Sequence, residues 1–350
     1  MTMTRSLAAI AVAAIGSLPG CLVDAGADDD PAEDNDTVEL GASPVKSLAS
    51  CADPGAMAHG GDIYVTCTGG GFPIYKASGP KGPFTLVGHV FPNKVGAPAW
   101  AVDDFWAPEL HHVDGKIIAY FSAKHATTGK HAIGAAWATS PEGPYTALPQ
   151  PLVSDPNGSK IDVHELTWKG RHFLYWKAEL FKMVNGHSVQ ADKIRARELA
   201  ADGLSFKGSS ETHTVLSAKE PWEAGVVEAP WVFESSNGGL YMFYSGAYFC
   251  NSSYGIGVAK ASHPLHAFVR ETMGKDGLIL ASGDRWLGPG HNAVIRDEGG
   301  KAWSFFHAYD DHQGIPRCAP KNGQADNNHR HLLSAPVAMS NGFPRIGADL

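Results

Sequence analysis

Five short stretches of this chain resemble one another and recur at near-constant spacing, which limits the possible folds more than any other feature. Each stretch is a glycine-containing turn followed by an apolar, aromatic segment, as in the second half of a β-hairpin. The turn glycines are separated by 54, 55, 69 and 61 residues; they are Gly61, Gly115, Gly170, Gly239 and Gly300. A second repeat trails the first and ends at Phe84, Tyr145, Phe206 and Phe268. A fixed period with several strands in each unit is typical of a β-propeller.

We therefore predict an all-β fold, a five-bladed β-propeller with four-stranded antiparallel blades, over residues 48–350. Composition supports this prediction, because 40 glycines and 23 prolines suit many short strands joined by turns. No long segment has the apolar periodicity of a helix. A closed ring of repeats is one cooperative unit, so we expect one domain and not two.

Polar residues stand just before each turn, on the strands expected to line the central channel. They are Asp53, Trp106 to Glu109, Asp162, Glu228 and His291. The inner strands of all blades end at one mouth of the channel, so these side chains should converge there. Carboxyl groups that are far apart in sequence would thereby come together, as two-carboxylate chemistry requires.

The N-terminus is predicted to be a targeting segment. Arg5 precedes an apolar run over 6–18 that is too short to span a bilayer, and the following Leu18-Pro19-Gly20-Cys21 resembles a bacterial lipoprotein cleavage box. Residues 1–21 are predicted to be a signal peptide that ends at a lipidated Cys21, and 22–47 a flexible tether. An ordinary secretory signal is the alternative. We expect an exported cell-envelope lipoprotein, or a secreted protein if Cys21 is not lipidated.

Charge limits the possible partners. The formal net charge is −8 and Lys and Arg form no run, so nucleic acid and anionic membrane surfaces are poor partners. Contact with a membrane would be through the lipid anchor alone, and we expect a monomer.

Four cysteines remain in the predicted propeller: Cys51, Cys67, Cys250 and Cys318. An even number in an exported chain suggests disulfides, with three possible pairings. We favour Cys51–Cys67, which flank the first hairpin, together with Cys250–Cys318; free buried thiols are the alternative. No CxxC motif occurs, which gives little support to a zinc or redox site.

The segments around the polar residues resemble glycoside hydrolase family 43, the five-bladed inverting arabinofuranosidases, xylosidases and arabinanases. One matching segment occurs per blade, in the family's order, and the resemblance covers about 51 to 346. The segments are Ala52-Asp53-Pro54, Trp106-Ala107-Pro108-Glu109, Ile161-Asp162, Val227-Glu228-Ala229-Pro230 and Gly288-Pro289-Gly290-His291-Asn292.

The resemblance implies a role for each of three acids. Asp53 matches the general base, which must be ionised to activate water, and Glu228 matches the general acid, which must be protonated. Asp162 matches the third acid, which holds the general acid in place and raises its pKa by like-charge proximity. Glu165, three residues after Asp162, is a competitor for the third role. We prefer Asp162, because alternation along a strand puts Glu165 on the opposite face.

Three further residues are candidates for the substrate site. The resemblance implies that His291 reaches the channel axis and contacts a calcium ion or its waters, although a lone histidine is more often structural. Arg330 matches in position the family arginine that faces the sugar. Trp106 is either a sugar-stacking platform or inter-blade packing. The other histidines of the last blade lack metal-ligand spacing, and loop or surface positions are expected for them: His307, His312, His329 and His331.

The leading hypothesis is an exported glycosidase that acts on plant-cell-wall pentosans, with α-L-arabinofuranosidase activity and no cofactor required for the chemistry. β-Xylosidase, endo-arabinanase and galactanase activities on the same site are alternatives. A retaining fructan hydrolase is disfavoured, since it would carry Asn-Asp-Pro-Asn where this chain has Ala52-Asp53-Pro54-Gly55. The non-enzymatic alternative is a cell-surface glycan-binding propeller lipoprotein.

Overall fold

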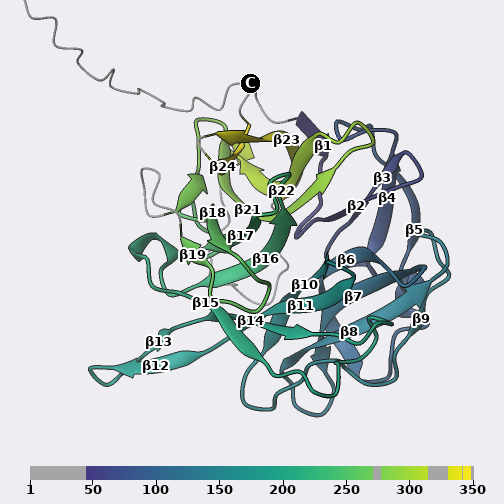
Figure 1. The fold of residues 1–350 in the computed structure, drawn as a ribbon, viewed down its shortest axis with the longest axis horizontal. Helices are drawn as coiled ribbons and strands as arrows, with labels where there is room; N and C mark the ends of the chain where they lie inside the picture. Colours follow the sequence, from purple (N-terminus) through teal and green to yellow (C-terminus); the bar gives the residue numbers. More distant parts are fainter. Residues whose placement is uncertain (1–44, 271–276, 314–329, 341, 348–350) are drawn as a thin grey trace, which may run out of the picture. The chain divides into compact units, whose positions relative to one another are not determined.

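The computed structural model describes residues 45–270, 277–313, 330–340 and 342–347. They all belong to one compact unit, Val38–Leu350. The predicted signal peptide, Cys21 and nearly all of the predicted tether lie outside the described residues. Within the described part, the strands form five antiparallel sheets and one separate hairpin, which confirms the predicted five-bladed β-propeller (Figure 1).

The first four blades follow one another along the chain, and each starts with its innermost strand. The first blade contains β2 (Gly55–His59), β3 (Asp62–Thr66), β4 (Pro73–Ala77) and β5 (Thr85–His89). The second contains β6 (Ala101–Val113), β7 (Lys116–His125), β8 (His131–Ala138) and β9 (Thr146–Ala147). The third contains β10 (Lys160–Trp168), β11 (Arg171–Ala178), β14 (Lys193–Glu198) and β15 (His213–Ser217). The fourth contains β16 (Val227–Glu234), β17 (Leu240–Gly246), β18 (Gly255–Ala261) and β19 (Val269–Arg270), with β20 (Leu278–Leu280) also paired to β18.

The fifth blade closes the ring by combining both ends of the described chain. Its strands are β21 (Trp286–Arg296), β22 (Ala302–Asp310), β23 (His331–Ser340) and β24 (Phe343–Ile346), together with β1 (Val45–Leu48). Strand β1 pairs antiparallel with β23, so the segment before the first blade completes the last one. The propeller therefore begins before residue 48, where the predicted tether was expected to end. Each inner strand contacts the next in the cyclic order β2, β6, β10, β16, β21 and back to β2.

The repeated turns join the first and second strands of each blade, as the sequence predicts. Gly61, Gly115, Gly170 and Gly300 all have φ between 71° and 84°, the left-handed region that glycine occupies without strain. The strands that follow supply much of the core, including the fully buried rings of Tyr120, Tyr175, Tyr241, Phe243 and Phe305. Burial of one such side chain contributes roughly 1.5–3 kcal/mol to stability.

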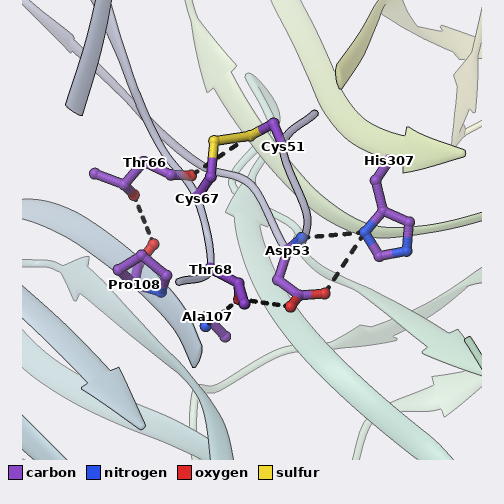
Figure 2. The surroundings of a disulfide bond; sticks show 8 residues. All are labelled: Cys51, Asp53, Thr66, Cys67, Thr68, Ala107, Pro108 and His307. Carbon is purple, nitrogen blue, oxygen red and sulfur yellow. Dashed lines mark hydrogen bonds and ion pairs between the residues drawn. A yellow bond between two sulfur atoms is a disulfide. The ribbon is translucent and has the colours of Figure 1, made fainter. Parts of the chain in front are cut away.

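A disulfide joins Cys51, just before β2, to Cys67, just after β3, with 5.1 Å between their Cα atoms. It ties down the segment that carries Asp53 into the first blade (Figure 2). Cys250 is also disulfide-bonded. Its predicted partner, Cys318, lies outside the described residues.

The remaining elements are short. A hairpin of β12 (Phe181–Val184) and β13 (His187–Gln190) interrupts the third blade between β11 and β14 (Figure 1). The 3-10 helices are η1 (Pro92–Lys94), η2 (Pro221–Glu223) and η3 (Asp311–Gln313). In the described part of the chain, no helix has the length and apolar character needed to cross a membrane.

Candidate active site

In every blade a residue with left-handed backbone conformation lies at the equivalent place, within the inner strand or, in the first blade, just before it. These residues are Asp53, Ala107, Asp162, Ala229 and His291, with φ between 48° and 56°. In blades two to five the pairing with the second strand shifts register there, which is the signature of a β-bulge. Bulges redirect side chains and are common beside active sites.

The backbone N–H of each bulge residue donates to a side chain of the preceding blade. In four junctions the acceptor stands six or seven residues after the repeated turn glycine: seven for Thr68, Ser122 and His307, and six for Ser245. In the third blade this position is Lys177, and an ammonium group cannot accept a hydrogen bond. The N–H of Ala229 donates instead to Asp162 Oδ2 at 3.0 Å. The third blade therefore departs from the repeat at the residues that surround Glu228.

Asp53 is surrounded by positive and hydrogen-bonding groups. Its Oδ1 accepts from Arg330 Nη1 at 2.6 Å, and its Oδ2 accepts from the Thr68 hydroxyl at 2.6 Å. The Nδ1 atoms of His291 and His307 each lie 3.6 Å from Oδ1 (Figure 2 shows His307 and Thr68). Burial by itself would raise the pKa of Asp53. The Arg330 guanidinium, with smaller contributions from both imidazoles and the Thr68 hydroxyl, outweighs burial and holds that pKa well below its usual range.

Glu228 is held between a cation and a phenol. Lys177 Nζ donates to its Oε2 at 2.7 Å, and the hydroxyl of Tyr254 donates to its Oε1 at 2.7 Å. Lys177 also lies 3.2 Å from Asp192 Oδ2. Burial would lower the pKa of Lys177, but the two carboxylates raise it on balance, so this side chain stays charged. A Cβ atom on Gly290 would come within 1.9 Å of the Tyr254 ring, so glycine at 290 is what lets the phenol reach Glu228.

Asp162 is linked to Glu228 through the main chain and through charge. It accepts the N–H of Ala229, the residue after Glu228. Burial raises the pKa of Asp162 to about 6; His291 and Lys177 act in the opposite direction, and the charges of Glu228 and Asp53 add to the rise. Asp162 can therefore both position Glu228 and respond to its charge.

Glu165, the competitor for the third role, has different neighbours. Its Oε1 accepts from the Thr167 hydroxyl at 2.9 Å and lies 2.9 Å from His172 Nδ1. Burial raises the pKa of Glu165. Among the described contacts, none joins Glu165 to Glu228. The geometry therefore supports the preference for Asp162.

Of the three other candidates, the structure places Arg330 and His291 beside Asp53. Arg330 contacts Asp53 and also lies over the Phe249 ring at 4.9 Å. His291 lies against Asp53, as described above. Trp106 is half-buried on β6 and stacks on His131, with ring centroids 4.3 Å apart. The indole therefore has a partner within its own blade, and sugar stacking by Trp106 stays a prediction.

The surroundings of His291 bear on the predicted calcium ion. The carboxylate nearest to its ring in the described residues is Asp53, which is already engaged by Arg330 and Thr68. Calcium prefers six to eight oxygen ligands, so an ion at His291 would draw most of them from water. The calcium site stays a prediction, and no step below depends on it.

The prediction for two histidines of the last blade was wrong. His307 and His331 are buried on strands β22 and β23, at 0% and 1% exposure, and not in loops or at the surface. His307 lies seven residues after Gly300 and thus takes the acceptor position described above. His331 packs its ring edge-on against Trp286. Of the other two, His312 lies in η3, and His329 lies outside the described residues.

Sequence reasoning also missed several groups around the acids: Lys177, Tyr254, Thr68 and His307. The usable signal was the register itself. Counting six or seven residues from each turn glycine aligns Lys177 with the acceptors of the other blades and marks it as the exception.

A five-bladed propeller with differently partnered carboxyl groups where its inner strands begin has the architecture of a glycoside hydrolase. Comparison with protein families agrees, since the family described as Glycosyl hydrolases family 43 matches residues 42–344. The chain belongs to this family, and it is a glycosidase.

Two curated relatives are each about one quarter identical to this chain in sequence. The chain is 26% identical over 284 residues to a probable arabinan endo-1,5-alpha-L-arabinosidase C of Aspergillus clavatus, covering 74% of this chain and 82% of that protein. It is 23% identical over 279 residues to the arabinan endo-1,5-alpha-L-arabinosidase A of Aspergillus niger, covering 73% and 81%.

Solved structures show the same fold. A thermostable family-43 glycoside hydrolase superposes with a TM-score of 0.74 at 24% identity, covering 87% of this chain and 95% of that one. The Cellvibrio cellulosa alpha-L-arabinanase in complex with arabinohexaose gives a TM-score of 0.66 at 18% identity, covering 85% and 96%.

Proposed function

We propose that this glycosidase hydrolyses α-L-arabinofuranosyl bonds of plant-cell-wall polysaccharides with inversion of configuration. The observation that supports this most is the contrast between two carboxyl groups. Asp53 is kept ionised by Arg330, whereas Glu228 lies beside Asp162, a third carboxyl that titrates near neutral pH. Two carboxyl groups in different environments suit an acid and a base that act together.

In this proposal Asp53 is the general base. Its carboxylate accepts a proton from a water molecule, which attacks the anomeric carbon from the face opposite the leaving group. The hydrogen bonds from Arg330 and Thr68 fix the carboxylate in one orientation. Arg330 therefore acts as a positioning residue for Asp53, and we propose that its guanidinium also faces the sugar.

Glu228 is the proposed general acid, which gives its proton to the leaving oxygen. Tyr254 and Lys177 orient its two oxygens. Asp162 holds the adjoining backbone through the Ala229 N–H and places a negative charge nearby. After turnover the proton lost by the water resides on Asp53 and the one lost by Glu228 on the released alcohol, so exchange with solvent restores both groups.

Endo-cleavage of arabinan is the second candidate, and the names of the curated relatives favour it. The two candidates differ in product size. Incubation with linear arabinan, arabinoxylan, xylan and galactan, followed by chromatography of the products, separates them. Release of arabinose alone from the first two supports the exo-acting arabinofuranosidase, oligosaccharides from arabinan support endo-cleavage, and xylose or galactose as the main product would contradict both.

Export and lipidation are proposed from sequence, since 1–44 lie outside the described residues. The apolar run over 6–18 followed by Cys21 supports a lipoprotein signal. Mass spectrometry of the mature N-terminus from a bacterial host would show a diacylated Cys21 if the proposal holds. An unmodified residue at the N-terminus would favour simple secretion.

A further inference from the structure

A second cluster of ligating side chains lies in the channel, farther along the inner strands than the catalytic acids. Glu109 Oε2 lies 2.7 Å from His111 Nε2 and 2.9 Å from His164 Nδ1. All three ligand atoms lie within 4.8 Å of one another. The side chains are 8%, 11% and 2% exposed, respectively, so they are almost completely removed from bulk solvent.

The outer nitrogen of each imidazole faces a hydrogen-bond acceptor. His164 Nε2 lies 3.3 Å from the carbonyl oxygen of Val232, and His111 Nδ1 lies 3.5 Å from Glu165 Oε2. An N–H on each outer nitrogen makes these contacts favourable. Histidines that bind metals have this arrangement, in which the outer N–H donates to a carbonyl or carboxylate and the inner nitrogen keeps its lone pair.

These contacts leave an excess of acceptors at the centre of the cluster. With neutral rings, the inner nitrogens of His111 and His164 both present lone pairs to Glu109 Oε2. One proton on that oxygen can lie in only one of the two contacts. A cation at the centre would satisfy the carboxylate and both imidazoles together, and it would offset the burial of negative charge.

We propose that Glu109, His111 and His164 bind one divalent transition-metal ion, best matched by zinc, which links the second and third blades. Two imidazoles and one carboxylate form a ligand set typical of zinc and unlike the all-oxygen set of calcium. Tetrahedral zinc lies ~2.0–2.2 Å from its ligand atoms and keeps them roughly 3.3 Å from one another. Each imidazole nitrogen would therefore move away from Glu109 Oε2 by about half an ångström when zinc binds.

The cluster is accessible from the end of the channel that carries the turns. A cavity of about 360 Å³ is lined there by residues that include His111, His164, Glu165 and Trp231. Water from this cavity can complete the coordination. The Trp231 ring lies 4.4 Å from the His164 ring and covers one side of the site. This site is separate from the calcium predicted at His291.

The test uses the full chain, stripped of metal with a chelator and then titrated with Co²⁺, whose visible absorption reports tetrahedral nitrogen and oxygen ligation. We expect one equivalent to bind to the unmodified chain, and zinc to displace it. Glu109→Gln should abolish binding yet keep the fold, because an amide can donate to one imidazole lone pair. Glu165→Gln removes only an outer partner and should weaken binding by ~10–100-fold.

The exposed pair His59 and His112, with ring nitrogens 3.1 Å apart, provides the control. His59→Gln should bind cobalt as the unmodified chain does. The proposal is overturned if the unmodified chain binds no cobalt, if Glu109→Gln binds it equally well, or if His59→Gln alone removes binding. The first result would identify the cluster as a proton-sharing network of imidazoles and carboxyl groups.

Discussion

Asp53 and Glu228 are both carboxyl groups of the propeller channel, yet their surroundings are opposed. Asp53 faces a guanidinium, two imidazoles and a hydroxyl. Glu228 accepts hydrogen bonds from one ammonium and one phenol. The N–H of the next residue, Ala229, donates to the carboxyl of Asp162. Neighbouring groups, and not the carboxyl group itself, therefore determine which residue is the base and which is the acid.

The contrast originates in one departure from the repeat. Four blades place a hydrogen-bond acceptor six or seven residues after the turn glycine, and the third blade places Lys177 at the equivalent position. That change supplies Glu228 with a cation and makes Asp162 the acceptor for the next bulge. Four substitutions test the contrast, in order of decreasing expected effect.

Asp53→Asn should remove activity on both polysaccharide and aryl arabinofuranoside, by ~10⁴-fold, because water activation is needed whatever the leaving group. Initial rates on the two substrates measure this. Asp62→Asn is the control. Asp62 lies at the turn of the same blade and pairs with Lys76, so this variant should have unchanged activity. A loss confined to polysaccharide would show that Asp53 is not the base.

Glu228→Gln should lower polysaccharide hydrolysis by ~10²–10⁴-fold. Hydrolysis of an aryl substrate should fall less, because a good leaving group needs little protonation. Glu198→Gln is the matched control, since Glu198 is bound by Arg171 away from the acids, and it should be active. Equal losses on both substrates would remove Glu228 from the acid role.

Asp162→Asn should move the alkaline limb of the pH–rate profile to lower pH by about one unit, since a negative charge beside the proton donor is lost. Stability should also change. The folded pKa of about 6 lies above the ordinary 3.8, so ionisation of Asp162 opposes folding as pH rises between these values. The variant should therefore unfold at a higher temperature than the unmodified chain at pH 7, and at a similar one at pH 4.

Movement of the alkaline limb by Glu165→Gln, with no movement for Asp162→Asn, would transfer the third role to Glu165. This comparison tests the choice between the two carboxyl groups of β10.

Lys177→Met should move the same limb in the opposite direction, to higher pH, because a positive charge beside the proton donor is removed. The loss of activity should be smaller than for the substitutions above, with kcat reduced only a few-fold at the pH optimum. Lys207→Met, which removes a cation that contacts Glu198, provides the control. No shift, or a shift to lower pH, would mean that Lys177 has a structural role only.

Much of the fold could be predicted because its main determinant is periodic. The turn glycines and the aromatic strands that follow them are local features, and each repeats in every blade. The closing strand β1 could not be predicted in this way, since Val45–Leu48 pairs with β23 from the other end of the chain. That pairing is non-local, and the short strand has no repeat signal.

The acids could be placed from the repeat and the family resemblance, but their partners could not. Tyr254 reaches Glu228 from another strand only because residue 290 is glycine, a tertiary constraint. His307 was misplaced because it was assessed by metal-ligand spacing and not by its register. The cluster of Glu109, His111 and His164 was missed for a related reason, since its ligands come from two blades.

The most direct test of the assignment is the configuration of the sugar at the moment of release. Inversion is expected, because Asp53 activates water and does not bond to the sugar. Proton NMR during the first turnovers on an aryl α-L-arabinofuranoside, before mutarotation, should therefore show β-arabinofuranose first. Initial appearance of the α-anomer would mean retention, and it would contradict the role of Asp53 as a general base.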